Sequence, residues 1–151
     1  MKIHVLEREQ LLPRPPGEVF PFFADARNLE AITPPLLRFR VVTPAPIEMR
    51  VGTLLQYRLR LHGISLDWLT RISELAPGER FVDEQIAGPY KLWHHTHEFE
   101  PHGDGATLMR DTVRYALPLW PLGELSAPLV RRDLARIFDF RHAACARHFA
   151  R

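Results

Sequence analysis

Residues 91–117 read KLWHHTHEFEPHGDGATLMRDTVRYAL, and the alternation in this stretch decides the fold class. Apolar and other side chains take turns along both halves, which is the pattern of β-strands that bury one face. Residues 103–105, with two glycines, separate the halves. We therefore predict two adjacent antiparallel strands, at about 91–100 and 107–117, joined by a turn.

The same period of two extends upstream to about residue 38. Turn signals at Gly52, Gly63, Gly78 and Gly88 cut this region into short segments. They predict strands at about 38–43, 53–61, 66–75 and 80–87. Residues 3–12 are also extended in character, before a proline-rich stretch, and bring the total to about seven strands.

Helical patterns occur at two places in the chain. Residues 18–24 and 26–32 predict two short helices, with Asp25 as the cap of the second and Pro21 as a kink in the first. After residue 117, apolar residues recur at helical spacing as far as Phe149 and predict one long helix. Its apolar face would hold Leu125, Leu129, Leu134, Ile137, Phe138, Ala144 and Cys145, and its wet face Arg131, Arg132, Arg136 and Arg147.

This order of elements predicts an α+β fold. A sheet with one apolar face and a single amphipathic helix must bury these faces against each other, so we expect a curved antiparallel sheet wrapped around the carboxy-terminal helix. The 151 residues, 46% of them hydrophobic, suffice for a core with a ligand cavity. We expect residues 1–151 to form a single domain.

Charge and composition exclude several classes of function. The net charge is only +2 and the arginines are scattered, which argues against a nucleic-acid partner. Cys145 is the only cysteine and no apolar run is long enough to span a membrane, so we expect a soluble, cytoplasmic protein with no membrane span. Nucleotide-binding and serine hydrolase motifs are absent from the sequence, and no cofactor is predicted.

Polar residues on the inward faces of the strands are the candidates for chemistry. The face that carries Trp93 and Phe99 also carries two histidines, and the neighbouring strands place carboxyl and amide groups on the same side. Five polar side chains would converge there: Asp83, Gln85, His95, His97 and Asp111. Burial requires them to bond one another or to face a wet cavity. A structural hydrogen-bonded network and a ligand-orienting or acid-base role both remain open.

A metal site is not predicted. The spacing His95-x-His97 puts two imidazoles on one strand face, but the next inward residue is Phe99 and no third ligand follows at a suitable position. Cys145 is expected to be a small buried hydrophobe, and Asp139 and Arg141 to be charges at the surface or the helix end.

Several motifs resemble those of the START-like (SRPBCC) superfamily, which includes polyketide cyclases, aromatases and birch-pollen-allergen-type proteins. They are Leu12-Pro13-x-Pro15-x-x-Glu18-Val19-Phe20-x-Phe22-Phe23-x-Asp25, Asn28-Leu29-x-x-Ile32-Thr33-Pro34-Pro35, Phe81-Val82-Asp83-x-Gln85-x-x-Gly88-Pro89, Trp93-x-His95-x-His97-x-Phe99 and Asp111-x-Val113-x-Tyr115-x-Leu117-Pro118. The resemblance covers about residues 6–141. It implies the helix-grip fold, with a deep hydrophobic cavity between the sheet and the last helix, and it implies no shared catalytic set.

The first functional hypothesis is binding of a bulky hydrophobic or aromatic small molecule, lipid or polyketide-like, in that cavity. Its predicted contacts are Tyr57, Trp68, Thr70, Phe81, Gln85, Trp93, Phe99, Met109, Val113, Tyr115 and Ile137, with His95, His97 and Asp111 orienting a polar end. The alternative is an enzyme of cyclase, aromatase or dehydratase type, in which His95 or His97, held by Asp83 or Asp111, moves a proton. If every hydrogen bond of these groups is internal, the enzyme hypothesis loses support.

A third hypothesis, a protein-interaction module, requires an exposed apolar patch. The arginines of the long helix do not supply one. The sequence makes no prediction about the oligomeric state.

Alternation along residues 93–99 makes the face assignment testable. His95→Ala is expected to weaken or redirect ligand binding more than His94→Ala, because only His95 lies on the inward face. Ligand dissociation constants of the two folded variants measure the difference, and equal values would refute the assignment.

Overall fold

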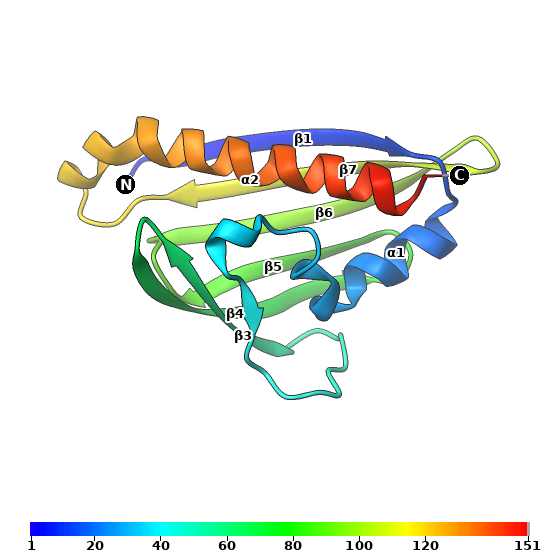
Figure 1. Ribbon diagram of the computed structural model, residues 1–151, viewed down its shortest axis with the longest axis horizontal. Helices are drawn as coiled ribbons and strands as arrows, with labels where there is room; N and C mark the ends of the chain where they lie inside the picture. The colour runs from blue at the N-terminus through cyan, green and yellow to red at the C-terminus, as the bar shows by residue number, and fades with distance from the viewer. Residues whose placement is uncertain (151) are drawn as a thin grey trace.

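A computed structural model describes residues 1–150 and contains one seven-stranded antiparallel sheet (Figure 1). Its strands are β1 (His4–Leu12), β2 (Arg40–Val41), β3 (Leu54–Leu61), β4 (Ile64–Ala76), β5 (Arg80–Ala87), β6 (Leu92–His102) and β7 (Ala106–Ala116). Their order is β1-β7-β6-β5-β4-β3-β2, so the predicted meander is confirmed and β1 pairs with β7. Arg151, which belongs to the predicted domain, lies outside the described residues.

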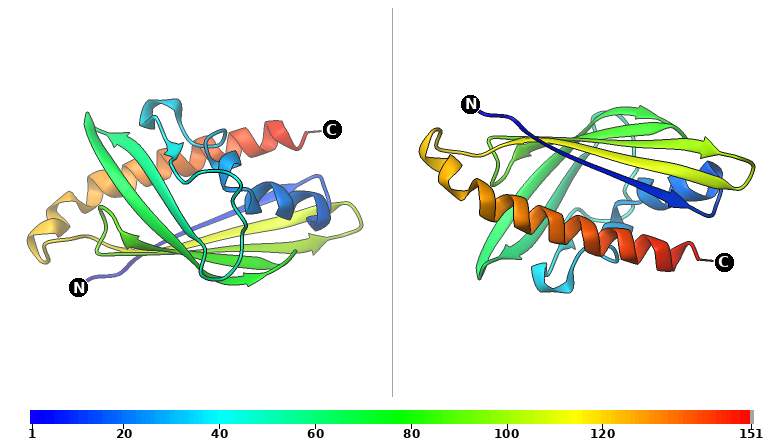
Figure 2. Two further views of the ribbon diagram at one scale, coloured as in Figure 1. Left: turned by 90° about the horizontal axis from the view of Figure 1, so that it is seen from below. Right: turned by 90° about the horizontal axis from the view of Figure 1, so that it is seen from above.

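The long helix α2 (Ala127–His148) lies along the inner side of the bent sheet (Figure 2). Leu134, Phe138, Ala144 and Cys145 form its buried stripe, and all four were expected there. Arg131, Arg132, Arg136 and Arg147 are exposed, also as expected. Since the sheet and the helix each cover the apolar face of the other, the architecture is the predicted helix grip.

Three short helical segments follow β1 and precede β3. α1 (Pro16–Ala24) continues through Pro21 and buries Val19, Phe20 and Phe23. As predicted, η1 (Ala26–Leu29) is capped by Asp25, whose Oδ1 accepts the backbone N–H of Arg27 at 3.1 Å. The predicted helix 26–32 is therefore a 3-10 turn, with bonds such as Ala31 N–H to Asn28 O, and such turns rarely grow. η2 (Pro35–Leu37) comes next.

The predicted strand 38–43 is reduced to the two residues of β2. Arg38 adopts a left-handed conformation with φ 48°, which turns the chain just before the strand. At the other end, the backbone N–H of Gln56 donates to the Thr43 hydroxyl at 2.7 Å and not to a backbone carbonyl of the neighbouring strand. Both features shorten a segment whose alternation suggested a longer strand.

The prediction that Leu125 and Leu129 belong to the buried face of the long helix is wrong. α2 begins only at Ala127, after η3 (Leu122–Ser126), so Leu125 precedes the helix and is 83% exposed. Leu129 lies in the first turn of α2 and is 42% exposed. Leu119, Trp120 and Leu122 are exposed as well. The loop from β7 to α2 therefore presents an apolar surface, which the sequence pattern did not predict.

Within residues 1–150, no helix combines the length and the apolar character that crossing a membrane requires.

Candidate functional site

The register of β5, β6 and β7 brings four of the five predicted polar side chains together. Asp83 on β5 pairs with His95 on β6, and His97, two residues further along β6, pairs with Asp111 on β7. Because inward positions alternate along each strand, all four side chains lie on the inner face. We refer to Asp83, His95, His97 and Asp111 as the His/Asp cluster.

Gln85 does not join the His/Asp cluster. Its Nε2 donates to the backbone carbonyl of Tyr90 at 2.6 Å, and its Oε1 accepts the Tyr90 N–H at 3.0 Å. The amide thus folds over the β5–β6 hairpin loop. A Cβ at position 88 would lie 2.6 Å from Gln85 Oε1, so Gly88 provides the room for this arrangement.

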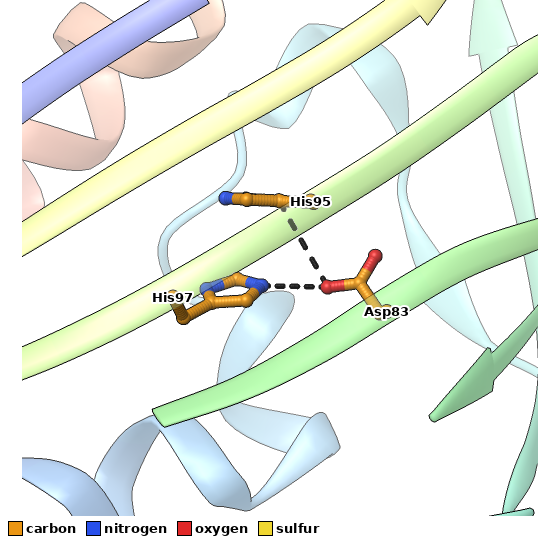
Figure 3. Close-up of side chains that lie close together, drawn as sticks. All are labelled: Asp83, His95 and His97. Atoms are coloured by element: carbon orange, nitrogen blue, oxygen red, sulfur yellow. Dashed lines mark hydrogen bonds and ion pairs between the residues drawn. The ribbon is translucent and has the colours of Figure 1, made fainter. Parts of the chain in front are cut away.

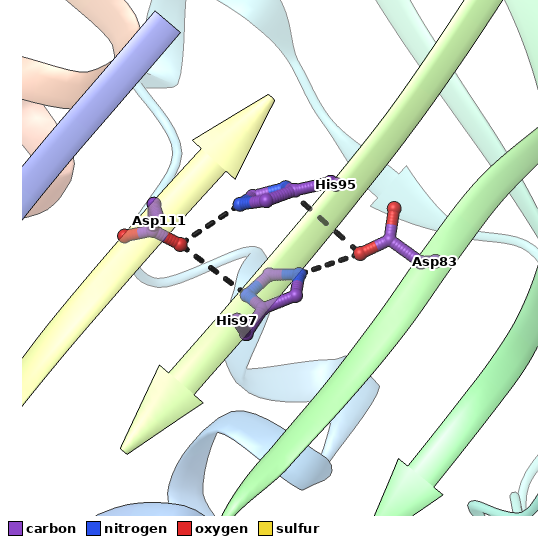
Figure 4. Close-up of polar contacts among 4 residues, drawn as sticks. All are labelled: Asp83, His95, His97 and Asp111. Atoms are coloured by element: carbon purple, nitrogen blue, oxygen red, sulfur yellow. Dashed lines mark hydrogen bonds and ion pairs between the residues drawn. The ribbon is translucent and has the colours of Figure 1, made fainter. Parts of the chain in front are cut away.

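The two imidazole rings are stacked between the two carboxylates (Figure 4). Their centroids are 3.7 Å apart and their planes differ by 25°. His97 Nε2 donates to Asp83 Oδ2 at 2.6 Å, and His95 Nε2 donates to Asp111 Oδ1 at 2.8 Å. Two longer contacts complete a cycle of four residues. His97 Nδ1 lies 3.4 Å from Asp111 Oδ1, and His95 Nδ1 lies 3.9 Å from Asp83 Oδ2.

The two carboxyl groups have lowered pKa values although Asp111 is buried and Asp83 is partly buried. Burial alone would raise both pKa values, but hydrogen bonds from the imidazoles outweigh it. For Asp111, the bonds from His95 and His97 hold its pKa far below the usual range. For Asp83, the bond from His97 and electrostatic interactions with His95, His97 and the Arg141 guanidinium lower the pKa.

The two histidines have opposite pKa shifts. Burial would lower the pKa of His97, but hydrogen bonds to Asp111 and Asp83 raise it above its ordinary value. Burial and the charge of His97 lower the pKa of His95, and its bond to Asp111 only partly compensates. These directions favour a cationic His97 and a neutral His95 beside two carboxylates. The single proton of His95 belongs on Nε2, where the short bond to Asp111 lies.

Donor atoms of Asp83, His95 and His97 lie within 4.8 Å of one another, a spacing at which three groups can share a metal ion (Figure 3). A metal ion binds about 2.1 Å from an imidazole nitrogen and close to the plane of the ring. Two rings stacked at 3.7 Å have nearly parallel planes, so no point satisfies both nitrogens. This geometry favours hydrogen bonding over metal ligation.

A cavity of about 340 Å³ lies between the sheet and α2. Three members of the His/Asp cluster, Asp83, His95 and His97, belong to its wall. Of the predicted contacts, five also belong to it: Tyr57, Trp68, Thr70, Trp93 and Ile137.

The remaining predicted contacts lie elsewhere on the inner face. Phe81, Phe99 and Met109 pack in the core beneath α1 with Phe20 and Phe23. Val113 and Tyr115 belong to a second core group with Leu134 and Phe138. Asp111 does not line the 340 Å³ cavity and instead lines a small cavity of about 30 Å³. The inward face of a strand is longer than the cavity, so alternation identifies the face but not the cavity wall.

Arg141 is the functional candidate that the sequence pattern missed. It was expected at the surface or the helix end, yet its side chain lines the cavity. Its Nε is buried without a hydrogen-bond partner among residues 1–150, and its guanidinium carbon lies 4.9 Å from the ring centroid of Phe138. The spacing Leu134, Phe138, Arg141 repeats every three or four residues and could have placed it on the buried face.

Removing one carboxylate tests the electrostatics of the cluster. Asp111→Asn is expected to lower the free energy of unfolding by about 3–5 kcal/mol near pH 6, because it leaves a buried imidazolium with one carboxylate. Since the pKa of Asp111 is lowered, its contribution is complete above the ordinary carboxyl pKa and is lost as the pH falls below about 4. Since the pKa of His97 is raised, its contribution is complete below about pH 6.5 and is lost as the pH rises through the folded value.

Urea unfolding of the wild type and the variant from pH 3 to pH 9 measures this difference. Glu98→Gln on the outer face of β6 is the control, and its cost is expected to stay within about 1 kcal/mol. A cost of Asp111→Asn that stays the same across the pH range would contradict the assigned charges.

Comparisons with known proteins bear on the fold. Among solved structures, the Zhui aromatase/cyclase from Streptomyces sp. R1128 aligns with a TM-score of 0.78 at 12% identity, over 97% of this chain and 93% of its own. Norcoclaurine synthase from Thalictrum flavum, in complex with dopamine and hydroxybenzaldehyde, aligns at 0.69 and 14% identity, over 99% and 90%. A START superfamily protein from Mycobacterium smegmatis aligns at 0.67 and 13% identity, over 93% and 95%.

At such low sequence identities, these alignments show only that the fold is shared. Comparison with curated proteins gives no match. The family described as polyketide cyclase / dehydrase and lipid transport matches residues 12–140, most of the chain. With its helix-grip fold, the chain therefore belongs to the polyketide cyclase / dehydrase and lipid transport family.

Proposed function

We propose that this protein binds a bulky apolar or aromatic small molecule in the cavity between the sheet and α2. The observation that carries the proposal is the cavity of about 340 Å³, lined by aromatic and aliphatic side chains with a few polar groups. Pockets for small molecules have about 300–1,000 Å³ and this kind of lining. In this proposal residues 1–151 are one ligand-binding domain of a cytoplasmic protein that needs no cofactor and no nucleic acid.

The walls of the cavity suggest how such a ligand is held. Tyr57, Trp68 and Trp93 provide flat apolar surfaces on the sheet, and Ile137 faces them from α2. The His/Asp cluster forms a polar part of the wall. A ligand with one polar group would place that group near the cluster and its apolar part against the aromatic rings.

An enzyme of cyclase or dehydratase type is the second candidate, and one observation favours it. His95 lies in the cavity wall, and its Nδ1 is 3.9 Å from the nearest carboxylate oxygen of the cluster. Since burial and His97 lower its pKa, this nitrogen is available to take a proton at neutral pH. The short hydrogen bonds of both rings are internal, however. We therefore rank binding first.

Filling the cavity tests the proposed function. Val130 lies in the cavity wall on α2, so Val130→Trp is expected to fill part of the space and weaken binding of the uncharged probe N-phenyl-1-naphthylamine at least about tenfold. Probe fluorescence in a titration of the purified protein gives the dissociation constant.

Arg136→Trp, at an exposed position of the same helix, is the matched control and should bind the probe as the wild type does. A wild type that does not bind the probe, or equal weakening by both substitutions, would contradict binding in this cavity.

A further inference from the structure

Two buried N–H groups in the cavity wall lack an acceptor. They are Trp68 Nε1, on β4, and Arg141 Nε, on α2, and neither has a hydrogen-bond partner among residues 1–150. Both side chains line the same cavity, from its two opposite layers. An indole and a guanidinium can only donate hydrogen bonds. Their missing partners must therefore be acceptors.

The charged groups around the cavity already have partners. Asp83 and Asp111 accept hydrogen bonds from the histidines of the cluster. Asp133, the other carboxylate of the wall, lies 2.8 Å from His62 Nε2. Arg141 packs over the ring of Phe138, which fixes the guanidinium without an oxygen. An acceptor for Trp68 and Arg141 is thus best supplied by a bound molecule.

The charge balance indicates what kind of acceptor fits. At this end of the cavity, Arg141 lies with the carboxylates of Asp83 and Asp111, which already accept hydrogen bonds from His97 and His95, so two negative groups stand beside the one permanent cation. A carboxylate on the ligand would add an unmatched charge inside a mostly apolar enclosure. A carbonyl oxygen accepts the same hydrogen bonds and adds no charge.

We propose that Trp68 Nε1 and Arg141 Nε form a donor pair that binds uncharged carbonyl oxygens of an otherwise apolar ligand. The proposal rests on the proposed function, since it needs a ligand in the cavity, and it adds the chemical class of that ligand. Trp68 and Arg141 act as specificity-determining residues, because an analogue without the oxygen leaves their N–H groups unpaired.

Three naphthalene probes of similar size separate the possibilities: 2-acetonaphthone, 2-ethylnaphthalene and 2-naphthoate. Their affinities are measured by displacement of N-phenyl-1-naphthylamine. The wild type is expected to bind the ketone about tenfold or more tightly than the hydrocarbon. Arg141→Met and Trp68→Phe should each reduce this preference severalfold, because each weakens binding of the ketone more than binding of the hydrocarbon.

Arg147→Met, at an exposed position on the same helix, is the matched control and should keep the full preference. A second measurement does not depend on the folding of any variant. In the wild type, the indole N–H resonance of Trp68 is expected to shift downfield with the ketone and not with the hydrocarbon.

The outcomes distinguish this proposal from the proposed function. Equal affinities for ketone and hydrocarbon, with no shift of the Trp68 resonance, would overturn the donor pair while the cavity remains a binding site. Tightest binding of 2-naphthoate, lost mainly in Arg141→Met, would overturn the uncharged acceptor. If none of the probes binds, the proposed function fails and the donor pair fails with it.

Discussion

Two ionised carboxylates on the inner face of the sheet depend on one imidazolium, and the site is built around this interaction. Asp83 and Asp111 are on strands either side of β6, and His97 lies between them with a nitrogen directed at each. An unpaired buried carboxylate would destabilise the folded protein. Hydrogen bonds from the two imidazoles, one of them cationic, offset this cost for Asp83 and Asp111. The pairing holds β5, β6 and β7 in one register and places a polar patch in an otherwise apolar interior.

The cavity lies where one part of the sheet and the facing part of α2 are not packed directly against each other. β3 and β4 contribute Tyr57 and Trp68 to its wall, and α2 contributes Leu134 and Phe138. At the other end, beneath α1, the same inner face is filled by phenylalanines from several elements, including Phe20 and Phe99. One half of the grip is thus a packed core and the other half encloses the cavity, with the His/Asp cluster at the boundary between them.

Alternation along the strands predicted much of this from the sequence alone. The period of two fixes which residues face inward, and the hairpin turns fix which strands are neighbours, so the convergence of His95 and Asp111 could be predicted. Gln85 could not be placed correctly, because its amide bonds the hairpin backbone instead of a neighbouring strand. The exposure of Leu125 depends on where α2 begins, and helical spacing does not determine the start of a helix. Arg141 was misassigned because a charged residue on a helix is usually solvated.

The protonation of the two stacked histidines is the most direct measure of whether one imidazolium lies between Asp83 and Asp111. Two-dimensional ¹H–¹⁵N NMR of the imidazole nitrogens at pH 7, assigned with His95→Gln and His97→Gln variants, reports which nitrogens carry protons. We expect His97 to be protonated on both nitrogens and His95 to be protonated only on Nε2. Two neutral rings, or two cationic rings, would contradict the central role of a single imidazolium between Asp83 and Asp111.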